Sequence, residues 1–489
     1  MMNSVLEKLL AVAIIALCLA SARPTTTSLQ PLTDDARDAA LLPLPGVEFR
    51  RVTHRNIKRE ARDRFQSTEK YAELHSYRSE LSGQQSATRR LGAARRRFGG
   101  PGYENITAAN PYGTQYGVSV TFGDQPLLLD LDTGSGDTWA LYDRTNCTTG
   151  TGRVIADGFC RFGPRYAGNF TYGAIKDEHL FIQYGDGEIV EGPLGYMDVT
   201  VGGIRVRNQT VGLANETFWH GNSVSSGVLG LAYPVLTNAY YGPRGQEDWW
   251  WAAQYSPVFS TMVGQGLVDS FFSVAINRPG GNLSAGVIGF GGVPGDVVGV
   301  DYDIAAQADI IVADVANVVS ETSDYSFYTI IPDGWYFGSS TDDKKYPYII
   351  DTGTSLIHLP IGKSMNILDP IHTPFPVLLP PFLTNPLAGA INNMFSPPAA
   401  FSLEHDGYLT TCDALAPRVA VVVDGTPFYL SPEDLIFRTV PDGLTGLCMT
   451  AIKGGPHGPF VLGDAFLKNV LAVFDIGDNV VQLASRVRY

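Results

Sequence analysis

The triplet Asp-Thr-Gly occurs twice in this 489-residue chain, each time directly after an apolar run. Leu127–Leu131 precedes Asp132–Gly134, and Tyr348–Ile350 precedes Asp351–Gly353. Short apolar runs that end at Gly-containing turns are typical of buried strands. Two carboxyl groups that such turns bring together share one proton, because like charges a few ångströms apart cannot both ionise. The repeat therefore predicts two related halves, each contributing one carboxyl group.

A second element also occurs in both halves. Gly227–Ala232 and Phe460–Asp464 each contain an apolar pair followed by a glycine, Gly230 or Gly463. Such a glycine lets one backbone pass close to another beneath the Asp-Thr-Gly turn. Val, Ile, Thr, Tyr and Phe recur in short runs broken by Gly and Asn, a pattern that favours a mostly β protein. The chain is 44% hydrophobic and 17% charged, so it can fill large cores.

From about residue 112 to 489 the chain resembles the pepsin-like aspartic proteases, with the motifs in the order of that family. Tyr116–Val120 resembles the first strand, Tyr184–Gly187 the tip of the flap, and Val461–Phe466 the closing segment. The resemblance implies an all-β, bilobal pepsin-like acid protease fold, with two pseudo-symmetric β lobes and the active-site cleft between them. We expect the lobes at residues 98–300 and 301–489.

By this resemblance, the carboxyl groups of Asp132 and Asp351 activate a water molecule for peptide hydrolysis. The ionised carboxyl takes a proton from the water, and the protonated one donates to the carbonyl oxygen. The neighbours of the pair are expected to hold it in place. Gly134 and Gly353 would supply backbone N–H donors, and Ser135 and Thr354 hydroxyl donors. Thr133 and Thr352 would cross-brace the two loops. Ordinary turn stabilisation is the alternative for these hydroxyls.

The resemblance also implies a lid over the substrate. Tyr184 is expected to cover the bound peptide, with Gly185 and Asp186 on the same tip, and Trp139 to support Tyr184 from behind. A Tyr in this position can also be a plain hairpin residue, and Trp139 a plain core residue. Asp186 would hydrogen-bond the substrate backbone.

Two positions depart from the family pattern. Gly136 stands where the family usually has Ser, and Ser226 where it usually has Asp. The two Asp-Thr-Gly triplets are further apart than is usual for the family, which indicates inserted loops. The candidates are Tyr240–Ala253, which contains three consecutive Trp residues at 249–251, and Pro360–Pro398, which contains a Pro-rich stretch at 374–381. The three Trp form either a docking patch or a rim loop.

The N-terminal region reads as targeting and processing sequence. Lys8 precedes an apolar run and Ala20-Ser21-Ala22, which predicts a signal peptide over residues 1–22. The run is shorter than the ~20 residues that a membrane span needs, so we expect no stable membrane anchor. Residues 1–97 carry 17 Lys and Arg against 10 Asp and Glu, whereas residues 98–489 carry 18 against 39. This contrast favours a basic propeptide at residues 23–97, cut after Arg97; a basic surface-binding tail is the alternative.

Cysteines and sequons agree with export. Once Cys18 leaves with the signal peptide, three pairings of the remaining four cysteines are possible. We favour the sequence-local pairing, Cys147 with Cys160 and Cys412 with Cys448. Six Asn-x-Ser/Thr sequons mark expected exposed positions that can carry glycans; they are Asn105, Asn146, Asn169, Asn208, Asn215 and Asn282.

Taken together, the sequence predicts a secreted aspartic endopeptidase made as a zymogen and active at acidic pH. Its substrates would be proteins or peptides, and its own propeptide an intramolecular inhibitor. We expect a monomer, no nucleic acid partner, and no metal or cofactor. A vacuolar destination is the alternative to the extracellular one, and a catalytically inactive binding or inhibitor protein of the same fold is the alternative function. The Arg cluster and the long loops hint at a fungal member of the family.

Overall fold

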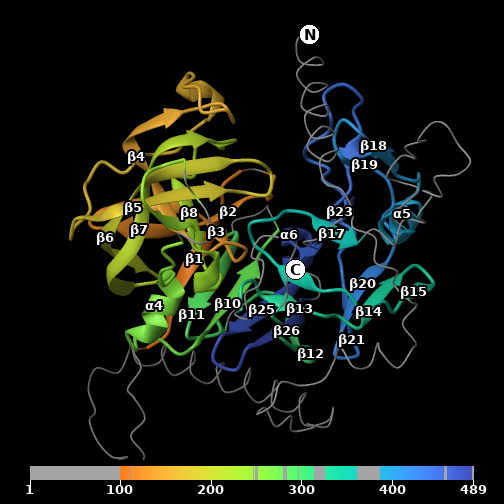
Figure 1. The fold of residues 1–489 in the computed structure, drawn as a ribbon. Coiled ribbons are helices and arrows are strands. Elements are labelled where there is room, and N and C mark those ends of the chain that lie inside the picture. The colour runs from red at the N-terminus through yellow and green to blue at the C-terminus, as the bar shows by residue number, and fades with distance from the viewer. Residues whose placement is uncertain are drawn as a thin grey trace, which may run out of the picture. The chain divides into compact units, whose positions relative to one another are not determined.

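The computed structural model describes residues 100–110, 112–245, 247, 252–278, 284–295, 297–312, 325–360, 386–455 and 460–486. The predicted signal peptide, propeptide, Trp249–Trp251, Pro374–Pro381 and Asn282 lie outside these residues. Strands dominate the described part, as the sequence predicts (Figure 1). Its helical segments are α4 (Val258–Gly264), α5 (Pro386–Asn392), α6 (Asp464–Leu467) and the 3₁₀ turns η2 (Asp157–Phe159) and η3 (Pro234–Leu236).

The largest sheet has 14 strands and contains segments from both halves of the chain. Its order is β12-β26-β25-β10-β11-β1-β2-β3-β8-β4-β7-β6-β5-β9. In chain order these strands are β1 (Gly102–Ala108), β2 (Tyr116–Phe122), β3 (Gln125–Asp132), β4 (Thr138–Cys147), β5 (Ala174–Gln183), β6 (Ile189–Val201), β7 (Ile204–Phe218), β8 (Gly227–Gly230), β9 (Ala239–Tyr241), β10 (Phe271–Ile276), β11 (Gly286–Phe290), β12 (Val300–Asp309), β25 (Val470–Asp475) and β26 (Val480–Arg486).

The second half builds three smaller sheets. The five-stranded sheet contains β13 (Thr329–Ile330), β16 (Tyr348–Ile350), β24 (Phe460–Leu462), β17 (Ile357–Pro360) and β23 (Ile452–Gly455). The four-stranded sheet contains β15 (Ser340–Asp342), β14 (Gly334–Phe337), β20 (Val419–Val423) and β21 (Thr426–Tyr429). The three-stranded sheet contains β18 (Ala400–Ser402), β19 (Gly407–Thr410) and β22 (Cys448–Met449).

The predicted duplication appears as two matching strand triplets. In the first half, β8 pairs parallel with β3 and antiparallel with β4. In the second half, β24 pairs parallel with β16 and antiparallel with β17. The Asp-Thr-Gly triplets begin the first loop, between β3 and β4, and the second loop, between β16 and β17. A Cβ on Gly230 would lie 2.5 Å from the Asp137 carbonyl oxygen of the first loop. A Cβ on Gly463 would lie 2.1 Å from the Thr354 carbonyl oxygen of the second loop. Both glycines therefore permit the close backbone approach that the sequence predicts.

Both predicted disulfides are present and confirm the sequence-local pairing. Cys147 is bonded to Cys160, and Cys412 to Cys448.

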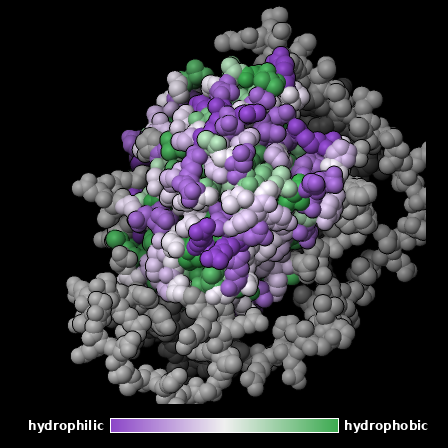
Figure 2. All heavy atoms as spheres, turned by 90° about the vertical axis from the view of Figure 1, so that its left-hand side faces the viewer, coloured by the Kyte–Doolittle hydropathy of each residue, from purple (hydrophilic) through white to green (hydrophobic). Residues whose placement is uncertain are grey.

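The surface of the described part on the side of β4–β7 is mixed. Hydrophilic residues predominate there, and apolar residues lie in small separate groups (Figure 2). No helix in the described part is long and apolar enough to cross a membrane.

Candidate active site

The fold places the two Asp-Thr-Gly triplets at equivalent strand ends. Asp132 is the last residue of β3, in register with Gly230 of β8. Asp351 directly follows β16, and its N–H donates to the Leu462 carbonyl of β24 at 3.2 Å. Because parallel neighbours hold both strand ends, the two carboxyl groups sit on loops whose backbones are fixed.

Each carboxyl group receives the same pair of donors. The Gly134 N–H donates to Oδ1 of Asp132 at 2.7 Å, and the Ser135 hydroxyl donates to its Oδ2. In the second loop, the Gly353 N–H donates to Oδ1 of Asp351 at 2.8 Å, and the Thr354 hydroxyl donates to its Oδ2 at 2.6 Å. Hydrogen bonds of this kind favour the ionised form of a carboxyl group.

The two carboxyl groups face each other across the loops. A Cβ on Gly134 would lie 2.6 Å from Oδ1 of Asp351, and a Cβ on Gly353 would lie 2.5 Å from Oδ1 of Asp132. Any side chain at either glycine would therefore occupy the space of the opposite carboxyl group. Burial, followed by the charge of Asp351, raises the pKa of Asp132, while the Ser135 and Gly134 donors oppose this shift. The pair is thus suited to hold one proton between two oxygens.

Thr133 and Thr352 join the loops in a reciprocal pattern. The N–H of each donates to the hydroxyl oxygen of the other at 3.0 Å. The Thr133 hydroxyl in turn donates to the Ile350 carbonyl at 2.9 Å, and the Thr352 hydroxyl to the Leu131 carbonyl at 2.8 Å. Both threonines are buried, so these four bonds fix the spacing of the loops. This is the cross-bracing that the resemblance implies.

Tyr184 lies at the turn between β5 and β6, and two tryptophans support it. The Trp139 indole N–H donates to the Tyr184 hydroxyl at 2.8 Å. The ring of Trp219 packs edge-on against both, at centroid distances of 5.9 Å from Tyr184 and 5.2 Å from Trp139. Sequence reasoning missed Trp219, because a single Trp after a strand carries no motif. Burial and the nearby Asp132 carboxyl raise the pKa of Tyr184, so its phenol stays protonated.

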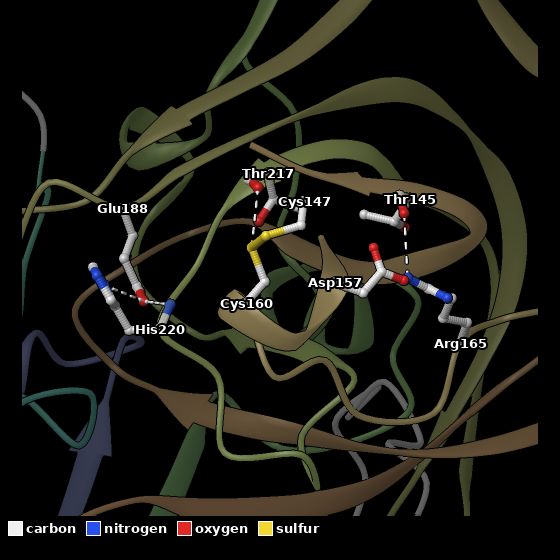
Figure 3. The surroundings of a disulfide bond; sticks show 8 residues. All are labelled: Thr145, Cys147, Asp157, Cys160, Arg165, Glu188, Thr217 and His220. Carbon is white, nitrogen blue, oxygen red and sulfur yellow. Dashed lines mark hydrogen bonds and ion pairs between the residues drawn. A yellow bond between two sulfur atoms is a disulfide. The ribbon is translucent and has the colours of Figure 1, made fainter. Parts of the chain in front are cut away.

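The rest of the flap tip forms a tight turn. Gly185 and Asp186 are exposed, and Asp186 accepts the Glu188 N–H at 3.1 Å. The Glu188 carboxyl in turn accepts the N–H of His220 and contacts its ring nitrogen at 3.3 Å (Figure 3). Burial, followed by the nearby Asp186 charge, raises the pKa of Glu188 to about 8.

The loop that carries His220 is held by the first disulfide. The Gly221 N–H donates to the Cys160 carbonyl at 3.0 Å, and Cys160 also lies against Thr217 (Figure 3). The Cys147–Cys160 bond therefore supports the base on which the flap tip rests. Glu188 and His220 were not found from the sequence, since only the folded chain brings them together.

Of the two departures from the family pattern, Gly136 lies within the first loop and Ser226 directly precedes β8. A Cβ on Gly136 would lie 3.1 Å from the Leu236 carbonyl, so the loop packs tightly there. Ser226 is buried, and its hydroxyl has no hydrogen-bond partner in the structure. Within the described part of the chain, the donors to the Asp132 carboxyl group are Gly134 and Ser135, and neither departure residue is one of them.

A pocket of ≈ 430 Å³ lies beside the second loop. Its walls are mostly apolar and include Leu356, Leu409, Phe437, Val440, Leu447 and Met449. Several polar groups of its lining are already bonded: the Ser355 hydroxyl donates to the Thr114 carbonyl at 2.6 Å, and His405 contacts Asp442 at 3.2 Å. The pocket therefore suits an apolar group better than a polar one.

The sequons differ in exposure. Four of the predicted positions are exposed, namely Asn105, Asn146, Asn169 and Asn208. Asn215 is only half-exposed and its amide oxygen is buried, so the expectation of full exposure is wrong there. The reason is that Asn215 lies in the stretch of β7 that has β4 on one side and β6 on the other. Among the described residues, no group of three or more His, Cys, Asp and Glu could hold a metal ion.

Two β lobes that each supply one carboxyl group to a shared site define a peptidase of the aspartic type. Comparison with known proteins agrees. The model of the eukaryotic aspartyl protease family matches residues 115–486, and the chain belongs to that family. A probable aspartic-type endopeptidase of Aspergillus fumigatus is 34% identical over 386 residues, which cover 76% of this chain and 79% of that protein.

More distant relatives extend this picture. Gastricsin of Rattus norvegicus is 27% identical over 386 residues, covering 76% of this chain and 80% of its own. Rhizopuspepsin-2 of Rhizopus niveus is 26% identical over 434 residues, covering 88% of this chain and 90% of its own. The crystal structure of the aspartic proteinase from Irpex lacteus matches with a TM-score of 0.56 at 19% identity, over 79% of this chain and 98% of that one. The bilobal fold expected from the sequence is thereby confirmed.

Proposed function

We propose that this protein is a secreted endopeptidase, made as a zymogen, that hydrolyses peptide bonds at acidic pH. The observation that carries the proposal is the opposed pair Asp132 and Asp351, each with one backbone and one hydroxyl donor. In this geometry one carboxyl takes a proton from a water molecule while the other donates to the carbonyl oxygen of the substrate. The two roles alternate, so the apparent pKa values belong to the pair.

The flap and the pocket support an extended peptide as the substrate. Tyr184, held by Trp139 and Trp219, would cover the peptide and exclude water from the reacting bond. Exposed Asp186 is available at the flap tip to accept a hydrogen bond from the peptide backbone. The mostly apolar pocket beside Ser355 favours apolar side chains near the cleaved bond.

Residues 23–97 are proposed to act as an inhibitory propeptide. Their net positive charge complements the acidic remainder of the chain. Near neutral pH the ionised carboxylates attract the Lys and Arg side chains, and acidification removes that attraction. The match to rhizopuspepsin-2 covers 88% of this chain, more than residues 98–489 contain, so it extends into the basic segment.

We also propose that the protein is exported and that it is a monomer. The predicted signal peptide and the two disulfides support an oxidising compartment. We propose the extracellular space as the destination, with the vacuole as the alternative. Secretion into culture medium, read by the mass of the secreted chain, separates these destinations.

The decisive experiment measures cleavage of an unfolded protein by residues 98–489 between pH 3 and pH 7. Asp132→Asn and a hydroxyl-containing transition-state mimic are tested alongside the unchanged enzyme. Acid-dependent cleavage that both treatments abolish supports the proposal. A folded, processed protein that cleaves nothing at any pH would instead support the inactive binding protein. Unprocessed protein that cleaves at pH 7 as fast as the mature form would refute the propeptide role.

A further inference from the structure

The carboxyl group of Asp137 is a buried acceptor that the proposed chemistry does not use. Asp137 is fully buried, five residues after Asp132. Its Oδ2 accepts the Asn238 side-chain amide at 2.7 Å, and both oxygens accept the Asn238 backbone N–H at 3.0 and 3.1 Å. Its Oδ1 also accepts the Tyr255 hydroxyl at 2.7 Å. A buried carboxyl group with this many donors is held in one orientation.

The two partners of Asp137 flank the segment that the sequence predicts to be inserted, Tyr240–Ala253. Asn238 directly precedes β9, and Tyr255 directly follows the return of the chain at Ala252–Gln254. The Ala253 N–H donates to the Ala239 carbonyl at 2.7 Å, and Tyr240 and Ala252 form an isolated β-bridge. The described residues 238–241 and 252–255 thus form two roots that lie side by side. Asp137 binds one residue from each root.

These roots brace the strand that leads to the flap. β9 pairs antiparallel with β5, with Leu180 opposite Ala239. The Phe181 N–H donates to the Asn238 carbonyl at 3.1 Å. β5 ends at Gln183, and the next residue is Tyr184. β5 therefore acts as the arm of the flap, and β9 is the strand at its outer edge (β5 is labelled in Figure 1).

Further contacts tie the same segment to the arm. The His179 ring of β5 contacts the Gly242 carbonyl through Nδ1 at 3.0 Å and the Glu247 carboxyl through Nε2 at 2.9 Å. Ala239, Ala253 and Tyr255 pack in the same apolar cluster as Trp139, with Tyr184 against it. The segment is thus bound to the flap arm by backbone pairing, side-chain bonds and apolar packing.

On its other side, Asp137 belongs to the loop of the first carboxyl group. The Gly230 N–H donates to the Asp137 carbonyl at 3.0 Å, and the Ala232 N–H donates to the Ser135 carbonyl at 2.9 Å. The backbone of Asp137 is therefore fixed to the loop that carries Asp132, while its side chain is fixed to the roots.

We propose that Asp137 is a positioning residue, which sets the flap arm relative to the first catalytic loop by clamping both roots of the inserted segment. This inference rests on the proposed peptidase function. It assigns a role to an insertion and to an acidic residue that the chemistry of the pair leaves unexplained.

The test compares Tyr255→Phe, Asp137→Asn and the double variant in residues 98–489. Tyr255→Phe removes one donor and keeps the ring in its apolar cluster. Asp137→Asn replaces one acceptor oxygen with an amide NH₂ group, which cannot accept hydrogen bonds from Asn238 or Tyr255. Tyr142→Phe is the matched control, because it removes a tyrosine hydroxyl bond to Asn169 in the same half of the chain, outside the roots.

The readouts are kcat and KM per active site, titrated with a tight transition-state mimic, together with the melting temperature. We expect kcat/KM to fall about 3–10-fold for Tyr255→Phe and at least tenfold for Asp137→Asn. The double variant should match Asp137→Asn alone, because both changes act on one clamp. Tyr142→Phe should leave kcat and KM unchanged.

Two results would overturn the inference. The first is wild-type kcat and KM per titrated site in Tyr255→Phe, even if its melting temperature falls, since that describes a purely structural bond. The second is full additivity in the double variant. If Asp137→Asn does not fold, Tyr255→Phe still decides the question. Failure of the proposed function looks different, because the unchanged protein would then neither cleave substrate nor bind the mimic.

Discussion

Replacing the Ser135 hydroxyl should move the acid limb of activity to higher pH. This hydroxyl donates to Oδ2 of Asp132 and lowers the pKa of that carboxyl group. The reaction needs one ionised carboxyl group, and activity is lost when that group takes up a proton as the pH falls. A change that raises the pKa of the pair therefore moves this acid-side loss of activity to a higher pH. Ser135→Ala removes the donor without removing the Gly134 N–H, which donates to Oδ1 at 2.7 Å.

The magnitude follows from the energy of one charged hydrogen bond. Such a bond contributes about 1.5–3 kcal/mol, and one pKa unit corresponds to about 1.4 kcal/mol. Because a water molecule can enter the space left by the hydroxyl, we expect the lower end, a shift of about one pH unit. The symmetric variant Thr354→Val, which loses a bond of 2.6 Å to Asp351, should shift the limb in the same direction.

The assay measures kcat/KM on a peptide between pH 2 and pH 7. Ser355→Ala is the control, because that hydroxyl donates to the Thr114 carbonyl and not to either carboxyl of the pair. Its acid limb should coincide with that of the unchanged enzyme. An acid limb that stays in place or moves to lower pH in Ser135→Ala would refute the reasoning.

Three further predictions concern the framework of the site. Thr352→Val removes the hydroxyl that bonds the buried Leu131 carbonyl, and should lower the free energy of unfolding by about 1–3 kcal/mol in a urea titration; a loss below the error of that titration would contradict the bracing role. Opening the disulfide that spans 36 residues, Cys412–Cys448, should cost about 1 kcal/mol more than opening the one that spans 13, measured on paired Cys→Ala variants, and the reverse order would count against a chain-entropy origin. Mass spectrometry of the secreted protein should find glycans at exposed sequons but not at half-buried Asn215, and full occupancy there would show that β7 is not folded when glycans are attached.

The main features of the fold were predictable because they are local in sequence. Asp-Thr-Gly marks a strand end and a tight turn at once, and its repetition indicates the duplication. The disulfides join cysteines that are close in sequence, so the local pairing was the simplest choice. The reciprocal bonds of Thr133 and Thr352 join residues far apart in sequence and were expected only from the family resemblance.

The remaining contacts depend on tertiary structure. Trp219 and His220 meet Tyr184 and Glu188 of the flap only because β7 returns beside β6. Asp137 reads in the sequence as one more acidic residue of a turn, and its partners lie about a hundred residues further along the chain. Asn215 fits the sequon pattern, yet its place between β4 and β6 limits its exposure. Such features need the register of the strands, which composition and spacing do not give.

β10 finds its two neighbours in the large sheet at different times while the chain is being made. β10 lies between β11 and β25, and its Phe272 stacks on Phe474 of β25. β25 follows β10 by about 200 residues of chain, so one edge of β10 stays unpaired until that stretch has been made. An open apolar edge is a template for wrong pairing between chains. Newly made molecules are therefore exposed to aggregation until β25 has been made, and a chain that stops before Val470 keeps that open edge.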